Sequence, residues 1–124
     1  MRIRRAAWGA ALTLTMVAAG CGSGRDAASE KACNDVQALL GAYDAQKDTV
    51  VEIRAVLLGA IEKKFREVAA PATGDVKTSI VGLADTIQQA NLTSDNSVTT
   101  LTPKFQEFEP KFATAREDVA AACA

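Results

Sequence analysis

The sequence lacks histidine altogether, and its methionines and its tryptophan, Met1, Met16 and Trp8, all lie within the first twenty positions. Beyond residue 20 there is therefore no histidine general base, no Ser-His-Asp triad and no histidine or methionine ligand for zinc, copper or haem. The aromatic residues that remain there are Tyr43, Phe65, Phe105, Phe108 and Phe112. No spacing of the other polar residues assembles a catalytic group. We therefore expect a protein that is not an enzyme and that holds no metal or cofactor.

Positive charge is also scarce beyond residue 20. Eleven Lys and Arg residues stand there against fifteen Asp and Glu residues, which gives a net charge of −4. This balance does not provide the basic surface that neutralises a phosphate backbone. We predict that the protein binds no nucleic acid.

The first twenty residues differ in kind from the rest. They contain three arginines and no acidic residue, and residues 6–19 are largely apolar. Fourteen residues of helix rise about 21 Å, which is shorter than the roughly 30 Å hydrocarbon core of a bilayer. Positive charge, a short apolar stretch and small residues before a cysteine are typical of a bacterial secretory signal peptide. We assign residues 1–20 to such a signal.

The end of this segment, Val17-Ala18-Ala19-Gly20-Cys21, resembles the lipobox of bacterial lipoproteins. The resemblance implies that the chain is cut before Cys21 and that Cys21 carries a diacylglycerol with palmitate-type acyl chains. Two acyl chains hold a protein stably at a membrane, so we expect lipid anchoring at the extracytoplasmic face of the cell membrane. The alternative is ordinary signal cleavage with Cys21 incidental. Residues 21–28 are expected to form a flexible tether before a domain over residues 29–124.

Two further cysteines, Cys33 and Cys123, form an even pair in an exported chain. Oxidising compartments favour disulfides, and two thiols alone make a poor metal site. We predict a structural Cys33–Cys123 disulfide. In the chain-entropy model, closing a loop of this length contributes about 4.6 kcal/mol.

Beyond the tether, apolar residues recur at helical spacing, and the alternation typical of strands is missing. The pattern predicts helices over residues 29–46, 49–70, 73–90 (or from 75) and 98–122, with a loop over residues 91–97. Ser29 is the expected N-cap of the first helix, and Thr49 begins a capping-box pattern. Pro103 suits a first helical turn, so the alternative start of the regular last helix is Thr102. Pro110 lies inside that helix and is expected to kink it.

The same spacing predicts which residues face the core. They are Ala32, Cys33, Val36, Leu39, Leu40 and Tyr43 in the first helix, Val50, Ile53, Leu57, Ile61, Phe65 and Val68 in the second, Val76, Ile80, Leu83 and Ile87 in the third, and Val98, Leu101, Phe105, Phe108, Phe112, Ala115, Val119 and Ala122 in the last.

These elements predict an all-α fold, a small antiparallel bundle of four helices closed by one disulfide. The alternative is a bundle of three helices with a long first helix over residues 29–70, because neither Gly nor Pro interrupts the chain near Asp48. The disulfide favours four, since the first and last ends of an up-and-down bundle lie together only when the number of helices is even.

The functional hypotheses rest on few residues. Phe105, Phe108 and Phe112 could line a pocket or a docking face, but their helical spacing favours the core. Glu107 and Glu109 point to different sides of a helix and do not form an acid/base pair. The preferred hypothesis is a non-enzymatic lipoprotein that binds another, unknown protein component of the cell envelope. The alternatives are a binder of a small hydrophobic ligand and a phage-type exclusion lipoprotein.

Overall fold

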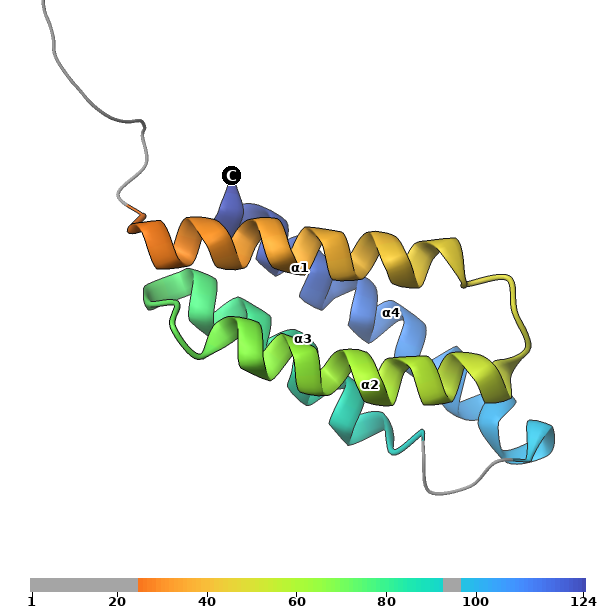
Figure 1. Ribbon diagram of the computed structural model, residues 1–124. Helices are drawn as coiled ribbons and strands as arrows, with labels where there is room; N and C mark the ends of the chain where they lie inside the picture. Colours follow the sequence, from red (N-terminus) through yellow and green to blue (C-terminus); the bar gives the residue numbers. More distant parts are fainter. Residues whose placement is uncertain (1–24, 93–96) are drawn as a thin grey trace, which may run out of the picture.

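The computed structural model describes residues 25–92 and 97–124, which form α1 (Ala27–Ala45), α2 (Val51–Ala69), α3 (Gly74–Ala90) and α4 (Val98–Cys123). Successive helices run in opposite directions, with α1 and α2 side by side in Figure 1 and α3 and α4 behind them. The predicted four-helix, all-α bundle is confirmed. The three-helix alternative is wrong, because α1 ends before α2 begins.

The start of α1 lies two residues earlier than the sequence predicted. Asp26 is the N-cap, and its carboxylate accepts a hydrogen bond from the backbone N–H of Ser29 at 2.8 Å. Ser29, the predicted cap, is buried, and its hydroxyl oxygen accepts a bond from the backbone N–H of Thr73 at 3.1 Å. Ser29 therefore joins the start of α1 to the start of α3.

The turn between α1 and α2 uses Thr49 differently from the predicted capping box. The Thr49 hydroxyl donates to the carbonyl of Gln46 at 2.8 Å, and its backbone N–H donates to the same carbonyl at 3.1 Å. The N-cap of α2 is Val50, which makes no capping bond through its side chain. Thr49 thus closes the turn that separates the two helices.

Helix α4 begins at Val98, as the predicted range over residues 98–122 had it, and not at the alternative start at Thr102. Ser97 is its N-cap and accepts a hydrogen bond from the backbone N–H of Thr100 at 3.2 Å. The helix then continues through both Pro103 and Pro110. A proline inside a helix removes one backbone hydrogen bond. The packing of α4 against the other helices therefore has to maintain the helical conformation at Pro103 and Pro110.

Side chains from all four helices fill the core. The largest apolar side chains that are fully buried are Val36, Leu58, Phe65, Ile80, Leu83, Leu101, Phe108 and Val119. Three predicted core residues, Val50, Ile53 and Val98, are more than half exposed. Five others are only partly buried against the core: Leu39, Leu57, Val68, Ala115 and Ala122. Helix α2 has apolar residues on two adjoining faces, and the face that continues through Leu58, Ile61 and Phe65 is the one buried in the core. Periodicity alone did not distinguish these faces.

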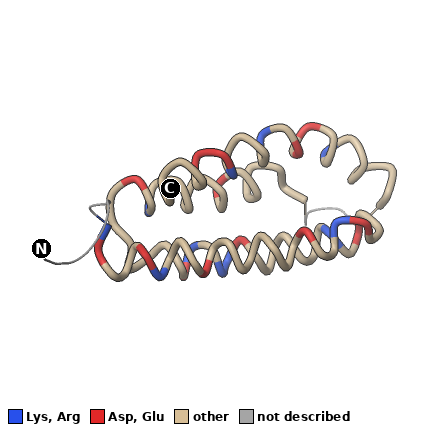
Figure 2. Tube along the Cα trace, turned by 90° about the horizontal axis from the view of Figure 1, so that it is seen from above, with Lys and Arg blue, Asp and Glu red and all other residues tan. Residues whose placement is uncertain are grey.

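Charged residues of both signs are interspersed along the helices (Figure 2). In the described part of the chain no helix is long and apolar enough to cross a membrane.

Candidate functional site

The sequence-predicted site residues fall in two places. Cys21 lies outside the described residues, so its lipidation stays a prediction. Cys33 and Cys123 form the predicted disulfide, with their Cα atoms 5.8 Å apart. It joins the first part of α1 to the last turn of α4.

The same end of the bundle is fixed by Arg25. Its Nε and Nη2 donate to the carboxylate of Glu30 at 3.2 and 3.1 Å, and its Nη1 donates to the carbonyl of Ala124 at 3.0 Å. The first described residue of the chain is therefore attached to the last one.

Asp26 adds a second set of bonds at this end. Besides capping α1, its carboxylate accepts a hydrogen bond from the hydroxyl of Thr73 at 3.0 Å. These bonds from Ser29 and Thr73 favour the ionised carboxylate and lower the pKa of Asp26 from its ordinary value. The carboxylate thereby links the start of α1 to the start of α3.

A groove lined by six charged residues lies at the opposite end of the bundle, and we call it the α1–α4 groove. It has a volume of about 390 Å³ and lies between the end of α1, the start of α2 and the middle of α4. Its lining residues are Tyr43, Asp44, Lys47, Asp48, Arg54, Glu109, Phe112, Ala113 and Arg116.

Arg54 is the more buried of the two arginines in this groove. Its side chain is 13% exposed, its guanidinium carbon lies 4.4 Å from the centre of the Phe105 ring, and its Nη2 donates to Glu109 at 2.7 Å. The same Nη2 lies 3.5 Å from the hydroxyl of Tyr43. Burial works against the charged form, but the bonds to Tyr43 and Glu109 outweigh it and raise the pKa of Arg54. The cation is thus held by an aromatic face on one side and a carboxylate on the other.

Arg116 joins α4 to α1 across the same groove. Its Nη1 and Nη2 each donate to one oxygen of Asp44 at 2.8 Å, and its guanidinium carbon lies 5.8 Å from the centre of the Phe112 ring. These two bonds lower the pKa of Asp44 and raise that of Arg116. Bidentate pairing of this kind fixes both the distance and the orientation of the two side chains.

The groove combines apolar rings with paired charges. Three of its lining residues are acidic and three are basic, so its net charge is zero. Arginine and tyrosine are among the side chains most often found at the energetic centres of protein interfaces. The groove therefore presents oriented charged groups beside aromatic rings.

Sequence reasoning missed this groove. Its ion pairs join residues 55 and 72 positions apart, Arg54 with Glu109 and Asp44 with Arg116. The one available signal was that Arg54 stands four residues before Leu58, in register with the buried face of α2. A charged residue in that register suggests a buried ion pair but does not identify its partner.

The phenylalanines of α4 belong to the core, as the sequence predicted. Phe105, Phe108 and Phe112 are all buried. Phe108 stacks on Phe112 with ring centres 4.9 Å apart and meets Phe105 edge to face at 6.0 Å, while Phe112 also meets Tyr43 edge to face at 5.6 Å. The rings contact one another, which accounts for their spacing without a ligand.

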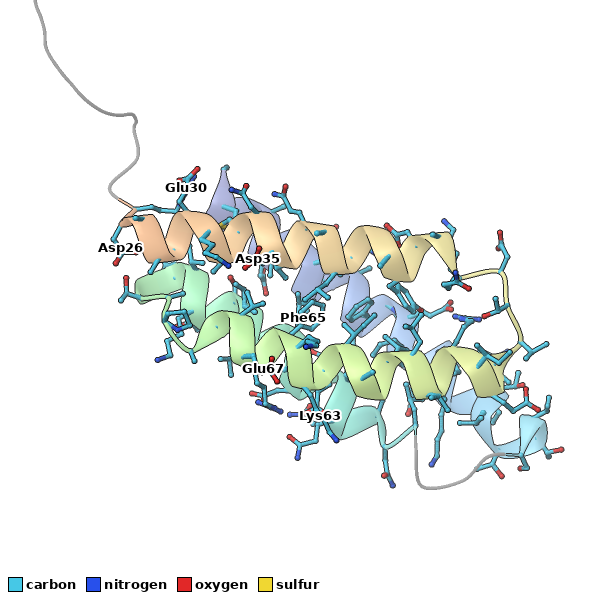
Figure 3. The ribbon with its side chains drawn as sticks, viewed as in Figure 1. Asp26, Glu30, Asp35, Lys63, Phe65 and Glu67 are labelled. Atoms are coloured by element: carbon cyan, nitrogen blue, oxygen red, sulfur yellow. A yellow bond between two sulfur atoms is a disulfide. The ribbon has the colours of Figure 1, made fainter. Side chains whose placement is uncertain are left out.

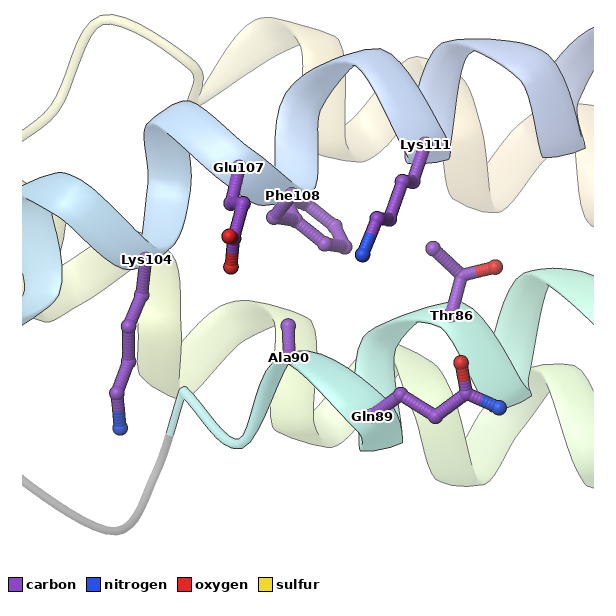
Figure 4. Close-up of a pocket in the computed structure, with 7 residues that line it drawn as sticks. All are labelled: Thr86, Gln89, Ala90, Lys104, Glu107, Phe108 and Lys111. Atoms are coloured by element: carbon purple, nitrogen blue, oxygen red, sulfur yellow. The ribbon is translucent and has the colours of Figure 1, made fainter.

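A smaller groove lies between α3 and α4 (Figure 4), with a volume of about 80 Å³. It is lined by Thr86, Gln89, Ala90, Lys104, Glu107, Phe108 and Lys111. In Figure 4 Glu107 and Lys111 lie on either side of Phe108, and the Lys104 side chain extends away from it toward the carbonyl of Asn91, to which it donates at 2.9 Å. The groove holds about two or three water molecules by volume, which is too small for a substrate of ordinary size.

No group of three potential metal ligands occurs within residues 25–92 and 97–124. The chain matches no protein-family model, no curated protein and no solved structure.

Proposed function

We propose that this protein is a lipid-anchored, extracytoplasmic helical bundle without enzymatic activity, and that it binds another protein of the cell envelope through the α1–α4 groove. The observation that carries the proposal is the Cys33–Cys123 disulfide. Structural disulfides persist in oxidising compartments and are rare in a reducing cytosol. The disulfide therefore supports the exported location that the lipobox-like Val17–Cys21 sequence implies.

The groove supports the binding part of the proposal. Arg54 and Arg116 are held over aromatic rings by Glu109 and Asp44, so little side-chain entropy remains to be lost when a partner contacts them. The groove is lined by residues from the end of α1 and the start of α2, at the end of the bundle opposite the start of α1 and therefore away from the proposed anchor.

The anchor is tested by metabolic labelling with a palmitate analogue. We expect the wild-type protein to be labelled and Cys21→Ser to be unlabelled, while Cys33→Ala with Cys123→Ala keeps the label. Equal labelling of wild type and Cys21→Ser would contradict the lipid anchor.

The groove is tested by placing a photo-crosslinking amino acid at Ala113, an exposed alanine that lines it, in cells that export the protein. The matched control is Ala120, an exposed alanine two turns further along α4 and outside the groove. We expect one reproducible crosslinked protein from position 113 and none from position 120. Equal crosslinking from both positions, or none from either, would contradict a partner at the groove.

The alternatives from the sequence are less well supported. A small hydrophobic ligand would need apolar side chains that are free to contact it, whereas Phe105, Phe108 and Phe112 are occupied with one another. A phage-type exclusion role has no specific observation in its favour.

A further inference from the structure

Helix α2 carries more apolar surface than the core uses. Val50, Ile53 and Val56 are 59%, 56% and 67% exposed. They follow one another at a spacing of three, so they lie along one side of the helix, next to the buried face. The fourth large apolar residue exposed in the described chain, Val98, begins α4 at the same end of the bundle (Figure 1).

The outer side of α2 becomes basic toward its other end. Lys63 and Lys64 are exposed there, and Figure 3 shows Lys63 and Glu67 pointing away from the bundle while Phe65 points into it. Lys64 lies 3.7 Å from Glu67, and both are largely exposed. We call Val50, Ile53, Val56, Lys63 and Lys64 the α2 outer face. It combines aliphatic side chains with two lysines, and because Glu67 lies beside Lys64 its net charge is +1.

Helix α4 has the opposite character. Its exposed charged residues are Glu107, Glu109, Lys111, Glu117 and Asp118. Four of these five are acidic, whereas two of the three exposed charged residues of α2 are basic, so an anionic surface repels the α4 side more than the α2 side.

We propose that, once the protein is anchored through Cys21, the bundle lies on the bilayer with the α2 outer face against an anionic lipid surface. The inference rests on the lipid anchor proposed above. Val50, Ile53 and Val56 would enter the boundary between headgroups and acyl chains, as the apolar side of an interfacial helix does. Lys63 and Lys64 would extend along that boundary with their ammonium groups among the lipid phosphates.

The length of chain before the bundle makes this contact available. Arg25 is tied to Glu30 and Ala124, so only residues 22–24 separate Cys21 from the bundle. Fully extended, that stretch spans about 14 Å, whereas the nineteen residues of α2 are about 28 Å long. The anchored bundle therefore stays beside the bilayer at high effective concentration, where even a weak surface contact is populated.

The size of the surface favours a bilayer over a protein partner or a second copy. A stable protein interface uses about 20 to 30 residues on each side and close shape complementarity. Three aliphatic side chains over half a helix fall well short of that. A bilayer requires no complementary shape. The proposed lipid anchor would already hold the bundle beside one.

Cleavage before Cys21 would remove Trp8, the one tryptophan of the sequence, so the processed protein has no tryptophan fluorescence of its own. A tryptophan introduced by substitution is then the only one present. Val56→Trp or Ile53→Trp then gives a single fluorescent reporter on the α2 outer face, and Gln106→Trp gives a matched control at an exposed position of α4. The full chain is expressed with its signal, and each processed variant is purified from membranes. It is then reconstituted into vesicles of phosphatidylcholine and phosphatidylglycerol with or without bromine on the acyl chains. Circular dichroism of each variant confirms that it is folded.

We expect brominated acyl chains to quench the fluorescence of Val56→Trp and Ile53→Trp several-fold more than that of Gln106→Trp, and the difference to shrink when phosphatidylglycerol is omitted. No quenching in either α2 variant in protein whose mass includes the lipid at Cys21 would overturn this inference and leave the anchor intact. A blue-shifted emission that depends on protein density but not on bromine would also overturn it, because a second copy would then cover the face. A mass without lipid at Cys21 would overturn the anchor and this inference together.

Discussion

Arg116 and Asp44 form a bidentate ion pair across the bundle, with two N–O distances of 2.8 Å. The pair joins α4 to the end of α1, while the Cys33–Cys123 disulfide joins the same two helices at the other end. The seam between α1 and α4 is therefore fixed by a covalent bond at one end and an ion pair at the other.

The ion pair predicts a pH dependence of stability. Arg116 lowers the pKa of Asp44 below its ordinary value of 3.8, so its contribution is complete above that pH and is lost as the pH falls through the lowered value. We expect Asp44→Asn to cost about 0.5 to 1 kcal/mol near pH 7, because the pair is partly exposed. In urea denaturation the difference between the two proteins should shrink steadily as the pH is lowered from 7 through the lowered pKa. A difference that does not change with pH would contradict this explanation.

Arg54 is expected to contribute more to stability than its partner Glu109. Arg54→Ala removes the contact with the Phe105 ring, the packing of the aliphatic stem and the ion pair, and should cost about 1.5 to 3 kcal/mol. Glu109 is 57% exposed, so Glu109→Gln should cost less than about 1 kcal/mol. Arg54→Met, which keeps the packing, should fall between them. Chemical denaturation of the three variants tests this order, and equal losses for Arg54→Ala and Glu109→Gln would refute it.

The fold was predictable because its determinants are local or covalent. The spacing of Val76, Ile80, Leu83 and Ile87 predicted α3, and all four are buried. The rotation of α2 was not predictable from periodicity, since Val50 and Ile53 fit a helical spacing as well as Leu58 does. What decides between them is the surface offered by α3 and α4, which is a property of the folded bundle.

The groove was not predictable for a related reason. Asp44 lies in the last turn of α1 and Arg116 in the second half of α4, and nothing local to either residue indicates the other. Their meeting depends on how far α4 rotates about its axis, which is set by the packing of Phe108 and Phe112. The disulfide was predictable because only two cysteines remained to pair.

Loss of the disulfide should weaken the bundle without abolishing its helices. Cys33→Ala with Cys123→Ala removes a constraint on the unfolded chain and should lower the free energy of unfolding by about 2 to 5 kcal/mol. Far-UV circular dichroism at low temperature should stay helical, because the core does not depend on either thiol. Hydrogen exchange should rise first near Asp26 and the end of α4, where the bond is lost. Exchange that rises first near Asp44 would contradict this order.

Pro110 offers a stabilising substitution. It is exposed and lies inside α4, where it cannot donate a backbone hydrogen bond to Gln106. Pro110→Ala should therefore be neutral or stabilise the protein, by up to about 3 kcal/mol. A loss of more than about 2 kcal/mol in thermal or chemical denaturation would show instead that the packing of α4 requires the proline.

The most direct test of an anchored, disulfide-closed envelope protein is the intact mass of the wild type purified from the membranes of cells that export it, measured after alkylation of free thiols. We predict a chain that begins at Cys21, carries a diacylglycerol, and takes up no alkylating reagent because Cys33 and Cys123 are bonded. A chain that begins at Met1, or one without lipid and with two alkylated cysteines, would contradict both the anchor and the exported, oxidised state of the bundle.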